Sequence, residues 1–290
     1  MVNMELYRDF YTVAKCGSLT AAAKELFVSQ PALSQSIARL ETQLGGRLFV
    51  RTAHGMALTP EGELVNDYAE RAISLLEIAQ NSFEEMRSLV MGTLRIGASD
   101  TLCRHFLLPH IRRFHDQHPD VRIHVTNRTS ADTLALLRAG KVDVAFVNLP
   151  IGEEEFNIRK CLPLQDGFAA APAYKKLFIT PEILSELPLI MMETASNTRV
   201  FFDRQLQIKG VRAQPEFELG SFDLVVEFAK AGLGIACITK EFIGDELESG
   251  ELVWLSGNIS LPPRSVGAAT LRDFTPTFAA TRFLDMMELT

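Results

Sequence analysis

The sequence lacks the features that mark membrane, secreted and redox-active proteins. No apolar run approaches the roughly 18 residues needed to cross a bilayer. The first residues, MVNMELYRDFYTVAK, carry acids and no long apolar stretch, so they do not predict a signal peptide. The cysteines (Cys16, Cys103, Cys161 and Cys237) are widely scattered and form no CxxC pair. Scattered cysteines of this kind are typical of proteins in a reducing cytoplasm. We therefore expect a cytoplasmic protein with no membrane partner.

Clusters that could carry out chemistry are also missing. Successive histidines five residues apart in the segment 105–118 point about 140° apart around a helix, so they cannot share one metal ion. Gly232-x-Gly234 follows a predicted helix and precedes a predicted strand, which is the reverse of a dinucleotide-binding loop. No Ser-His-Asp or paired-carboxylate arrangement emerges from the spacing. We therefore predict no enzyme, no metal and no cofactor.

Charge is unevenly distributed along the chain. The net charge of the 290 residues is −7, which argues weakly against nucleic acid as a partner. Residues 1–59 nevertheless hold six basic and four acidic side chains, a net of +2, which leaves −9 for the rest. A basic head on an acidic body is typical of a DNA-binding module attached to another domain.

Residues 18–45 predict two helices joined by a tight turn. Ser18 is a good N-cap for a helix over about 19–26, and Ser29 caps the next, with Pro31 tolerated in its first turn. One apolar face of the second helix repeats at spacings of four, three and four, at Leu33, Ile37, Leu40 and Leu44. Gly45-Gly46 then ends that helix.

The opposite face of the second helix is small and polar: Pro31, Ser34, Gln35, Ala38, Arg39 and Thr42. Glutamine can pair with adenine through two hydrogen bonds, and serine can contact several bases. The segment RLFVRTAHGMALT then predicts two short strands around a turn, with Arg51 at the base of this wing. A winged helix-turn-helix places such a helix in a DNA groove. The predicted contacts to double-stranded DNA are Ser29, Gln30, Pro31, Ser34, Gln35, Arg39, Arg51 and His54. The alternative is a small helical bundle with a polar surface, although His54 alone is better explained as a solvated turn residue.

A long helix is predicted to follow the wing. Thr59-Pro60-Glu61 is a helix start, and no breaker follows Gly62 until Gly92. A heptad-like seam steps by four and three through Leu64, Tyr68, Ala72, Leu75, Ala79, Ser82, Met86 and Leu89. A helix of this length has only marginal stability in water without a partner. We expect it to form a homodimer with a second copy; the alternative is packing on the chain's own body.

From residue 92 onward, strands and helices alternate. Strands are predicted over 93–98, 121–126 and 142–147, with helices near 102–117 and 131–139. A second set has strands over 167–171, 189–192, 216–219 and 235–238, with helices near 199–207 and 222–231. A strand over 264–271 and a helix over 275–288 complete the chain. This order predicts parallel sheets covered by helices.

Ligands of open α/β sheets bind beyond the carboxyl ends of the strands. The polar residues at these exits are the predicted effector site: Ser99, Asp100, Thr101, Asn127, Arg128, Thr129, Asn148, Ser196, Asn197, Thr198, Arg199, Gly220 and Ser221. Arg128 and Arg199 favour an anionic effector, whereas Asp100 opposes one. Each serine, threonine or asparagine could instead be only a helix cap.

The head carries a long, gapless motif. It runs SLTxAAxxL, VSQPALSxxIxxLExxLG, LFxR and LTxxG between Ser18 and Gly62. This motif resembles that of the LysR-type transcriptional regulators, and the length and layout of the whole chain fit the same family. The chain departs from it after 235–238, where the family often has proline and this sequence has Thr239-Lys240.

The resemblance implies an α+β multidomain architecture. A winged helix-turn-helix would span 1–59, a linker helix 60–91, and a two-lobed α/β effector domain similar to periplasmic binding proteins 92–290. Lobe I would comprise about 92–162 and 267–290, and lobe II about 163–266. Some relatives sense peroxide through cysteines, but the segment 196–209 has none here.

The resemblance also implies a sequence-specific regulator that responds to a small molecule. A homodimer or homotetramer would bind DNA, and RNA polymerase is a further candidate partner. The alternatives are an effector-independent DNA-binding regulator and an enzyme whose head serves only assembly.

Overall fold

The computed structural model describes residues 3–52, 55–88, 92–151 and 154–287. The chain divides into two compact units, Met1–Arg87 and Ser88–Thr290, each of which is described by itself. None of the described helices is long and apolar enough to cross a membrane.

The first unit is a winged helix-turn-helix with an additional N-terminal helix. It contains α1 (Met4–Cys16), α2 (Leu19–Glu25), α3 (Gln30–Leu44), the hairpin β1 (Phe49–Thr52) and β2 (Gly55–Leu58), and α4 (Pro60–Ser88). Ser18 and Ser29 cap α2 and α3 as predicted, since their hydroxyls accept from the N–H groups of Ala21 and Ala32. Helix α1 was not predicted, although Leu6, Phe10 and Val13 recur at helical spacing and are buried against α3 and the hairpin.

Two backbone approaches position the hairpin. The Glu41 carboxylate, near the end of α3, accepts from the N–H groups of Leu48 at 2.8 Å and Phe49 at 3.3 Å. Gly62, in the first turn of α4, lies so close to β1 that a Cβ there would be 2.1 Å from the Leu48 carbonyl oxygen. The wing is therefore tied to both the helix before it and the helix after it.

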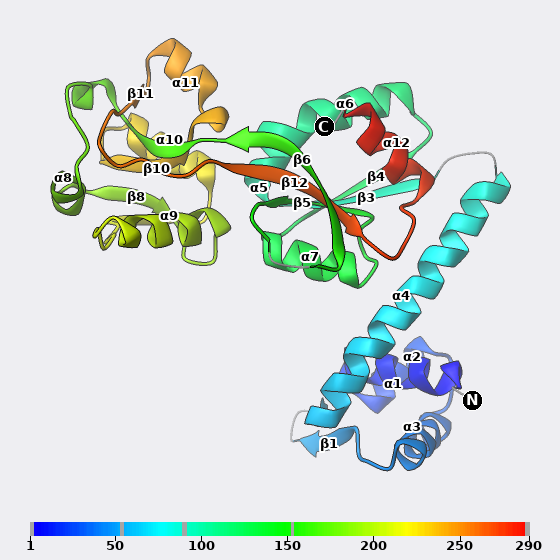
Figure 1. Ribbon diagram of the computed structural model, residues 1–290. Helices are drawn as coiled ribbons and strands as arrows, with labels where there is room; N and C mark the ends of the chain where they lie inside the picture. Colours follow the sequence, from blue (N-terminus) through cyan, green and yellow to red (C-terminus); the bar gives the residue numbers. More distant parts are fainter. Residues whose placement is uncertain (1–2, 53–54, 89–91, 152–153, 288–290) are drawn as a thin grey trace. The chain divides into compact units, whose positions relative to one another are not determined.

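The second unit contains two sheets, which we call lobe I and lobe II (Figure 1). Lobe I has the strand order β4-β3-β5-β12-β6. Its strands are β3 (Thr93–Ala98), β4 (Arg122–Asn127), β5 (Val144–Asn148), β6 (Phe156–Leu164) and β12 (Arg264–Leu271). Strands β3, β4 and β5 are parallel, whereas β12 runs antiparallel to both β5 and β6. Only the first three therefore fit the parallel pattern that the sequence predicts.

Helices of lobe I connect or cover these strands. They are α5 (Asp100–Leu102), α6 (Leu108–Gln117), α7 (Ser130–Arg138) and α12 (Phe278–Met286). The predicted helix near 102–117 is interrupted by a π-helical turn over Cys103–Leu107. Phe146 of β5 and Phe283 of α12 pack ring to ring in the core, so the C-terminal helix completes lobe I.

Lobe II has the strand order β11-β7-β10-β8-β9. Its elements are β7 (Asp166–Ala170), α8 (Pro181–Glu186), β8 (Leu189–Met192), α9 (Asn197–Ile208), β9 (Phe217–Leu219), α10 (Phe222–Lys230), β10 (Ile235–Thr239), α11 (Gly244–Ser249) and β11 (Val253–Trp254). The chain leaves lobe I between β6 and β7, at Gln165, and returns to it at Arg264. A 3₁₀ turn over Lys240–Phe242 follows β10 directly.

We predict that Gly62→Ala destabilises the first unit by about 1–3 kcal/mol, because a backbone oxygen blocks the added methyl group. Chemical denaturation followed by circular dichroism measures the change. Gly46→Ala is the matched control, since nothing lies within 4 Å of a Cβ at that position. Equal stability of the two variants would contradict the close approach of α4 to β1.

Candidate functional site

The outer face of α3 presents the side chains that the sequence assigns to DNA. Ser29, Gln30, Pro31, Ser34, Gln35 and Arg39 are all exposed, as is Arg51 in β1. The face is held in place by its buried reverse side, where Leu33, Ile37 and Leu40 pack in the core. His54 lies outside the described residues. The structure thus leaves one polar helix face free, and the base contacts themselves stay a prediction.

A cavity of about 280 Å³ lies between lobe I and lobe II. Its walls come from strand ends and the helix starts that follow them. The lining residues are Ser99, Asp100, Thr101, Leu102, Asn127, Arg128, Thr129, Ser130, Asp132, Asn148, Met192, Glu193, Ser196, Asn197, Thr198, Gly220, Phe222, Thr239 and Phe242. The strand-exit argument therefore leads to one shared cavity, which includes all the predicted effector residues except Arg199 and Ser221.

Helix caps account for some of the polar lining. The Ser99 hydroxyl accepts from the N–H of Leu102 at 3.4 Å, and Thr129 caps α7 by accepting from Asp132 at 3.3 Å. Ser196 stands at the N-cap position of α9, but its hydroxyl makes no capping bond. It is therefore available to a ligand, next to the N–H groups that begin α9.

The charged lining is more acidic than the sequence suggests. Asp100, Asp132 and Glu193 contribute carboxylates, and Arg128 contributes the cation. Asp100 accepts from the Asn127 amide at 3.0 Å, so part of its hydrogen-bonding capacity is used within the wall. Asn148 Oδ1 is a buried acceptor with no hydrogen-bond partner among the residues that the structure describes. A buried acceptor of this kind favours a ligand that brings a donor.

The structure does not bring Arg199 into the cavity wall with the other predicted effector residues. Its side chain is buried in α9 rather than in the cavity wall, and it donates to both Asp203 oxygens, at 2.9 and 3.0 Å. It also donates to the Met192 carbonyl and pairs with Glu218. Burial lowers its pKa, but the two carboxylates outweigh this, so that the pKa of Arg199 is raised. Arg199 therefore holds α9 on the sheet of lobe II.

Several lining residues were missed from the sequence. Thr239 is the last residue of β10. Its hydrogen-bond partners lie on strands far away in the sequence, so the neighbouring residues gave no sign that it lines the cavity. Glu193 directly follows β8 and could have been found by the same strand-exit rule that found Asn148. Phe222 and Phe242 form an apolar part of the wall and resemble ordinary core positions in the sequence.

The cysteines are poor candidates for redox chemistry. Burial raises the pKa of Cys103 to about 11 and that of Cys161 to about 11, and it raises the pKa of Cys237 still further. Reactive cysteines need a lowered pKa, since the thiolate is the reacting form. Within the described parts of the chain, no group of three or more His, Cys, Asp or Glu side chains could hold a metal ion.

Comparison with known proteins assigns both units. Residues 4–63 match the model of the bacterial regulatory helix-turn-helix protein, lysR family, and residues 87–289 match the LysR substrate binding domain. A probable RuBisCO transcriptional regulator of Synechocystis sp. is 31% identical over 266 residues, covering 86% of this chain and 75% of that protein. The uncharacterized HTH-type regulator YeiE of Escherichia coli is 30% identical over 286 residues, covering 98% of this chain and 96% of YeiE.

A solved structure has the same fold along nearly its full length. Full-length CbnR in complex with its target DNA is 18% identical, with a TM-score of 0.64, and 99% of each chain is covered.

We predict that Cys103 and Cys161 react slowly with iodoacetamide at pH 7 and faster by about tenfold per pH unit up to their pKa of about 11. The raised pKa leaves little thiolate at neutral pH. Mass spectrometry of the alkylated peptides measures each rate, and the same chain in urea is the control. Alkylation of the folded chain at pH 7 as fast as in urea would contradict the burial of these thiols.

Proposed function

The chain belongs to the LysR family of bacterial regulators, and from that premise we propose that a small polar effector in the cavity controls how a dimer binds operator DNA. The family membership shows a DNA-binding transcriptional regulator with a substrate-binding domain. The observation that carries the effector role is the cavity of about 280 Å³ between two lobes, lined by polar strand exits. Pockets of a few hundred Å³ suit small metabolites.

The cavity lining guides the choice of effector. The sequence favours an anionic effector through two arginines, but Arg199 is taken up by carboxylates within lobe II. Three carboxylates and the unpaired Asn148 acceptor instead favour a ligand that carries a cationic amine or other donors. Arg128 and the start of α9 can still bind an acidic group. We therefore propose a zwitterionic or amine-bearing metabolite.

Dimerisation is proposed through α4. Leu64, Tyr68, Leu76 and Phe83 are between 53% and 64% exposed, and we call this set the α4 stripe. A second copy of α4 would cover these side chains. Leu64 and Tyr68 belong to the predicted heptad-like seam, whereas Leu76 and Phe83 lie beside it. Leu89 of that seam lies outside the described residues. Two such dimers would join to form the homotetramer that the family resemblance implies.

A dimer would also compensate for the low positive charge of a single head. A net of +2 on residues 1–59 supports few phosphate contacts, whereas two heads on one duplex add their contacts. In this proposal Gln30, Pro31, Ser34 and Gln35 contact bases, and Arg51 contacts phosphate. The regulator would act in the cytoplasm, where the chromosome lies, with RNA polymerase as a further candidate partner.

Two alternatives make different predictions. An effector-independent regulator would bind DNA identically with and without any small molecule. An enzyme with an assembly head would consume a metabolite, and turnover by the purified protein would favour it. The family membership favours regulation over catalysis.

We predict that Gln35→Ala weakens binding to the operator by about ten- to hundredfold, the value of a lost base-reading pair. The probe is a duplex selected by the wild-type protein from a random-sequence pool, and fluorescence anisotropy measures affinity. Binding to an unselected duplex should hardly change. Equal losses on both duplexes would refute base reading by Gln35.

Arg51→Ala is the matched contrast. It should weaken binding to both duplexes and reduce the slope of log affinity against log salt by about 0.9 per head, since one phosphate contact is lost. An unchanged slope would show that Arg51 does not contact phosphate.

We predict that Tyr68→Glu shifts the protein from dimer to monomer, because it places a charge in the α4 stripe. Sedimentation equilibrium measures the change in mass. Glu77→Lys is the control, since Glu77 is exposed on α4 outside the stripe. A Tyr68→Glu variant that stays dimeric would show that another surface makes the dimer.

We predict that amine-bearing metabolites raise the melting temperature of the full chain. Differential scanning fluorimetry with amino acids, polyamines, dicarboxylates and sugars tests this, with L-serine, spermidine, succinate and glucose as first probes. Stabilisation by dicarboxylates alone would support an anionic effector instead of an amine-bearing one. No stabilisation by any class would favour the effector-independent regulator.

A further inference from the structure

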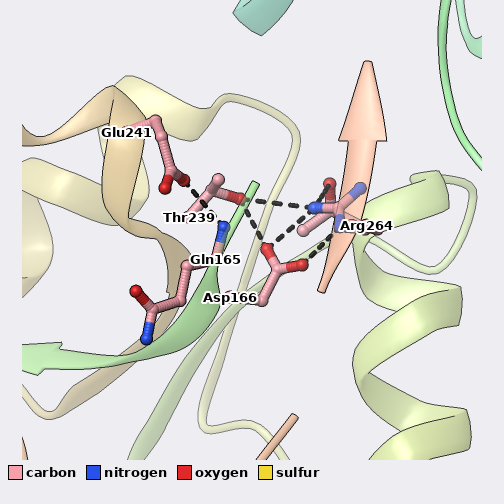
Figure 2. Close-up of polar contacts among 6 residues, drawn as sticks. Gln165, Asp166, Thr239, Glu241 and Arg264 are labelled. Carbon is pink, nitrogen blue, oxygen red and sulfur yellow. Dashed lines mark hydrogen bonds and ion pairs between the residues drawn. The ribbon is translucent and has the colours of Figure 1, made fainter. Parts of the chain in front are cut away.

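The two places where the chain crosses between the lobes meet at one buried ion pair. Arg264 is the first residue of β12 and lies opposite Leu164, the last residue of β6, in the lobe I sheet. Asp166 is the first residue of β7 and lies opposite Thr239, the last residue of β10, in the lobe II sheet. Figure 2 shows the Arg264 and Asp166 side chains facing each other across this junction.

The guanidinium of Arg264 is bound by lobe II groups. Its Nε–H donates to Asp166 Oδ2, and Nη2 donates to Asp166 Oδ1 at 2.8 Å. Nη2 also lies 3.3 Å from Thr239 Oγ1, and the Phe201 ring lies under the guanidinium at 5.1 Å. The side chains of Arg264 and Asp166 are only 2% and 0% exposed. A strand that belongs to lobe I is thus anchored inside lobe II.

The first crossing is attached to lobe II as well. The Gln165 N–H donates to Glu241 Oε2 at 2.8 Å (Figure 2). The Gln165 carbonyl accepts from the Lys240 N–H at 2.9 Å. The first crossing is therefore fixed to the segment that follows β10, and the second is bonded to Thr239 at the end of β10 itself. Any rotation of one lobe against the other changes the geometry of this junction.

The junction also forms part of the cavity wall. Thr239 and Thr198 both line the cavity, and Arg264 Nη2 donates to Thr198 Oγ1 at 3.2 Å. The Thr239 hydroxyl donates to Asp166 Oδ1 at 2.6 Å, so its hydrogen is already used. The Thr198 hydroxyl accepts from Arg264, and no described residue accepts its hydrogen. That hydrogen can be donated to a ligand in the cavity.

We propose that Arg264 is the positioning residue that couples effector binding to the orientation of the two lobes. It acts through Thr198, which a bound effector contacts on one side and Arg264 holds on the other. The guanidinium is a rigid, planar donor group, so a shift of Thr198 must alter its bonds to Asp166 or Thr239. The coupling rests on the proposed effector function, but its structural part can be tested without ligand.

Hydrogen–deuterium exchange of the full chain, without ligand, provides that test. Thr198→Val removes the hydroxyl that accepts from Arg264 and keeps the side-chain volume. We expect it to speed exchange at the crossings, over residues 164–168 and 264–267, by about tenfold, the effect of losing one charge-assisted hydrogen bond. Thr101→Val is the matched control, because Thr101 lines the same cavity and lies on lobe I. It should leave the crossings at the wild-type rate.

Arg264→Lys completes the ligand-free comparison. It keeps a charge beside Asp166 but loses the planar donor group, so exchange should rise over 197–201, at the start of α9, as well as at the crossings. Wild-type exchange at the crossings in Thr198→Val, or an equal rise in Thr101→Val, would overturn the coupling. Arg264 would then serve only to hold the core together. The two threonine variants decide this even where Arg264→Lys does not fold.

A ligand arm separates the coupling from the effector function. L-serine is the first probe, followed by the panel compound that most stabilises the wild type. It should slow exchange at the crossings in the wild type, and this protection should be lost in Thr198→Val at saturating concentration. A compound that binds the wild type without protecting the crossings would overturn the coupling and leave effector binding intact. A panel in which nothing binds would overturn effector binding, while the ligand-free comparison still decides the role of Arg264.

Discussion

The buried pair of Arg264 and Asp166 is the interaction on which the second unit depends. Each of these charges would be strongly destabilising if it were buried alone. They are tolerated together because the carboxylate accepts two donors of the guanidinium and Thr239 adds a third hydrogen bond. Since one partner begins a strand of lobe I and the other a strand of lobe II, the pair requires both sheets to end at the same place. That convergence brings the strand exits together around the cavity.

The first unit is held by different forces. Its helices pack through an apolar core, and the wing is fixed by the Glu41 carboxylate and by the close approach of Gly62. Within the described residues, these contacts leave the outer face of α3 and the α4 stripe exposed. The first is suited to DNA and the second to another copy of α4. In the proposed dimer, the second head would compensate for the weak positive charge of the first.

Local signals in the sequence predict much of this architecture. Ser18 and Ser29 are caps, and caps depend only on the residues beside them. The strand exits were found by the same reasoning, because Ser99, Asn148 and Ser196 directly follow or precede elements with clear patterns. The strand β6 was missed because the alternation of apolar and polar residues that starts at Phe156 breaks at Arg159-Lys160. Arg264 could not be interpreted from the sequence, since its partners come from other strands and helices. Arg199 has one local partner, Asp203 four residues later in α9, but its contact with Glu218 could not be read from neighbouring residues.

In the proposed function, the cavity in one unit and the DNA-binding face in the other act on a common equilibrium. Such coupling is reciprocal, so an effector that changes operator affinity must itself bind with a different affinity when the operator is present. Isothermal titration of the effector into the free protein and into the protein–operator complex measures this directly. If the two sites are coupled, the two dissociation constants differ, and their ratio equals the effector-induced change in operator affinity. Identical dissociation constants would contradict the coupling.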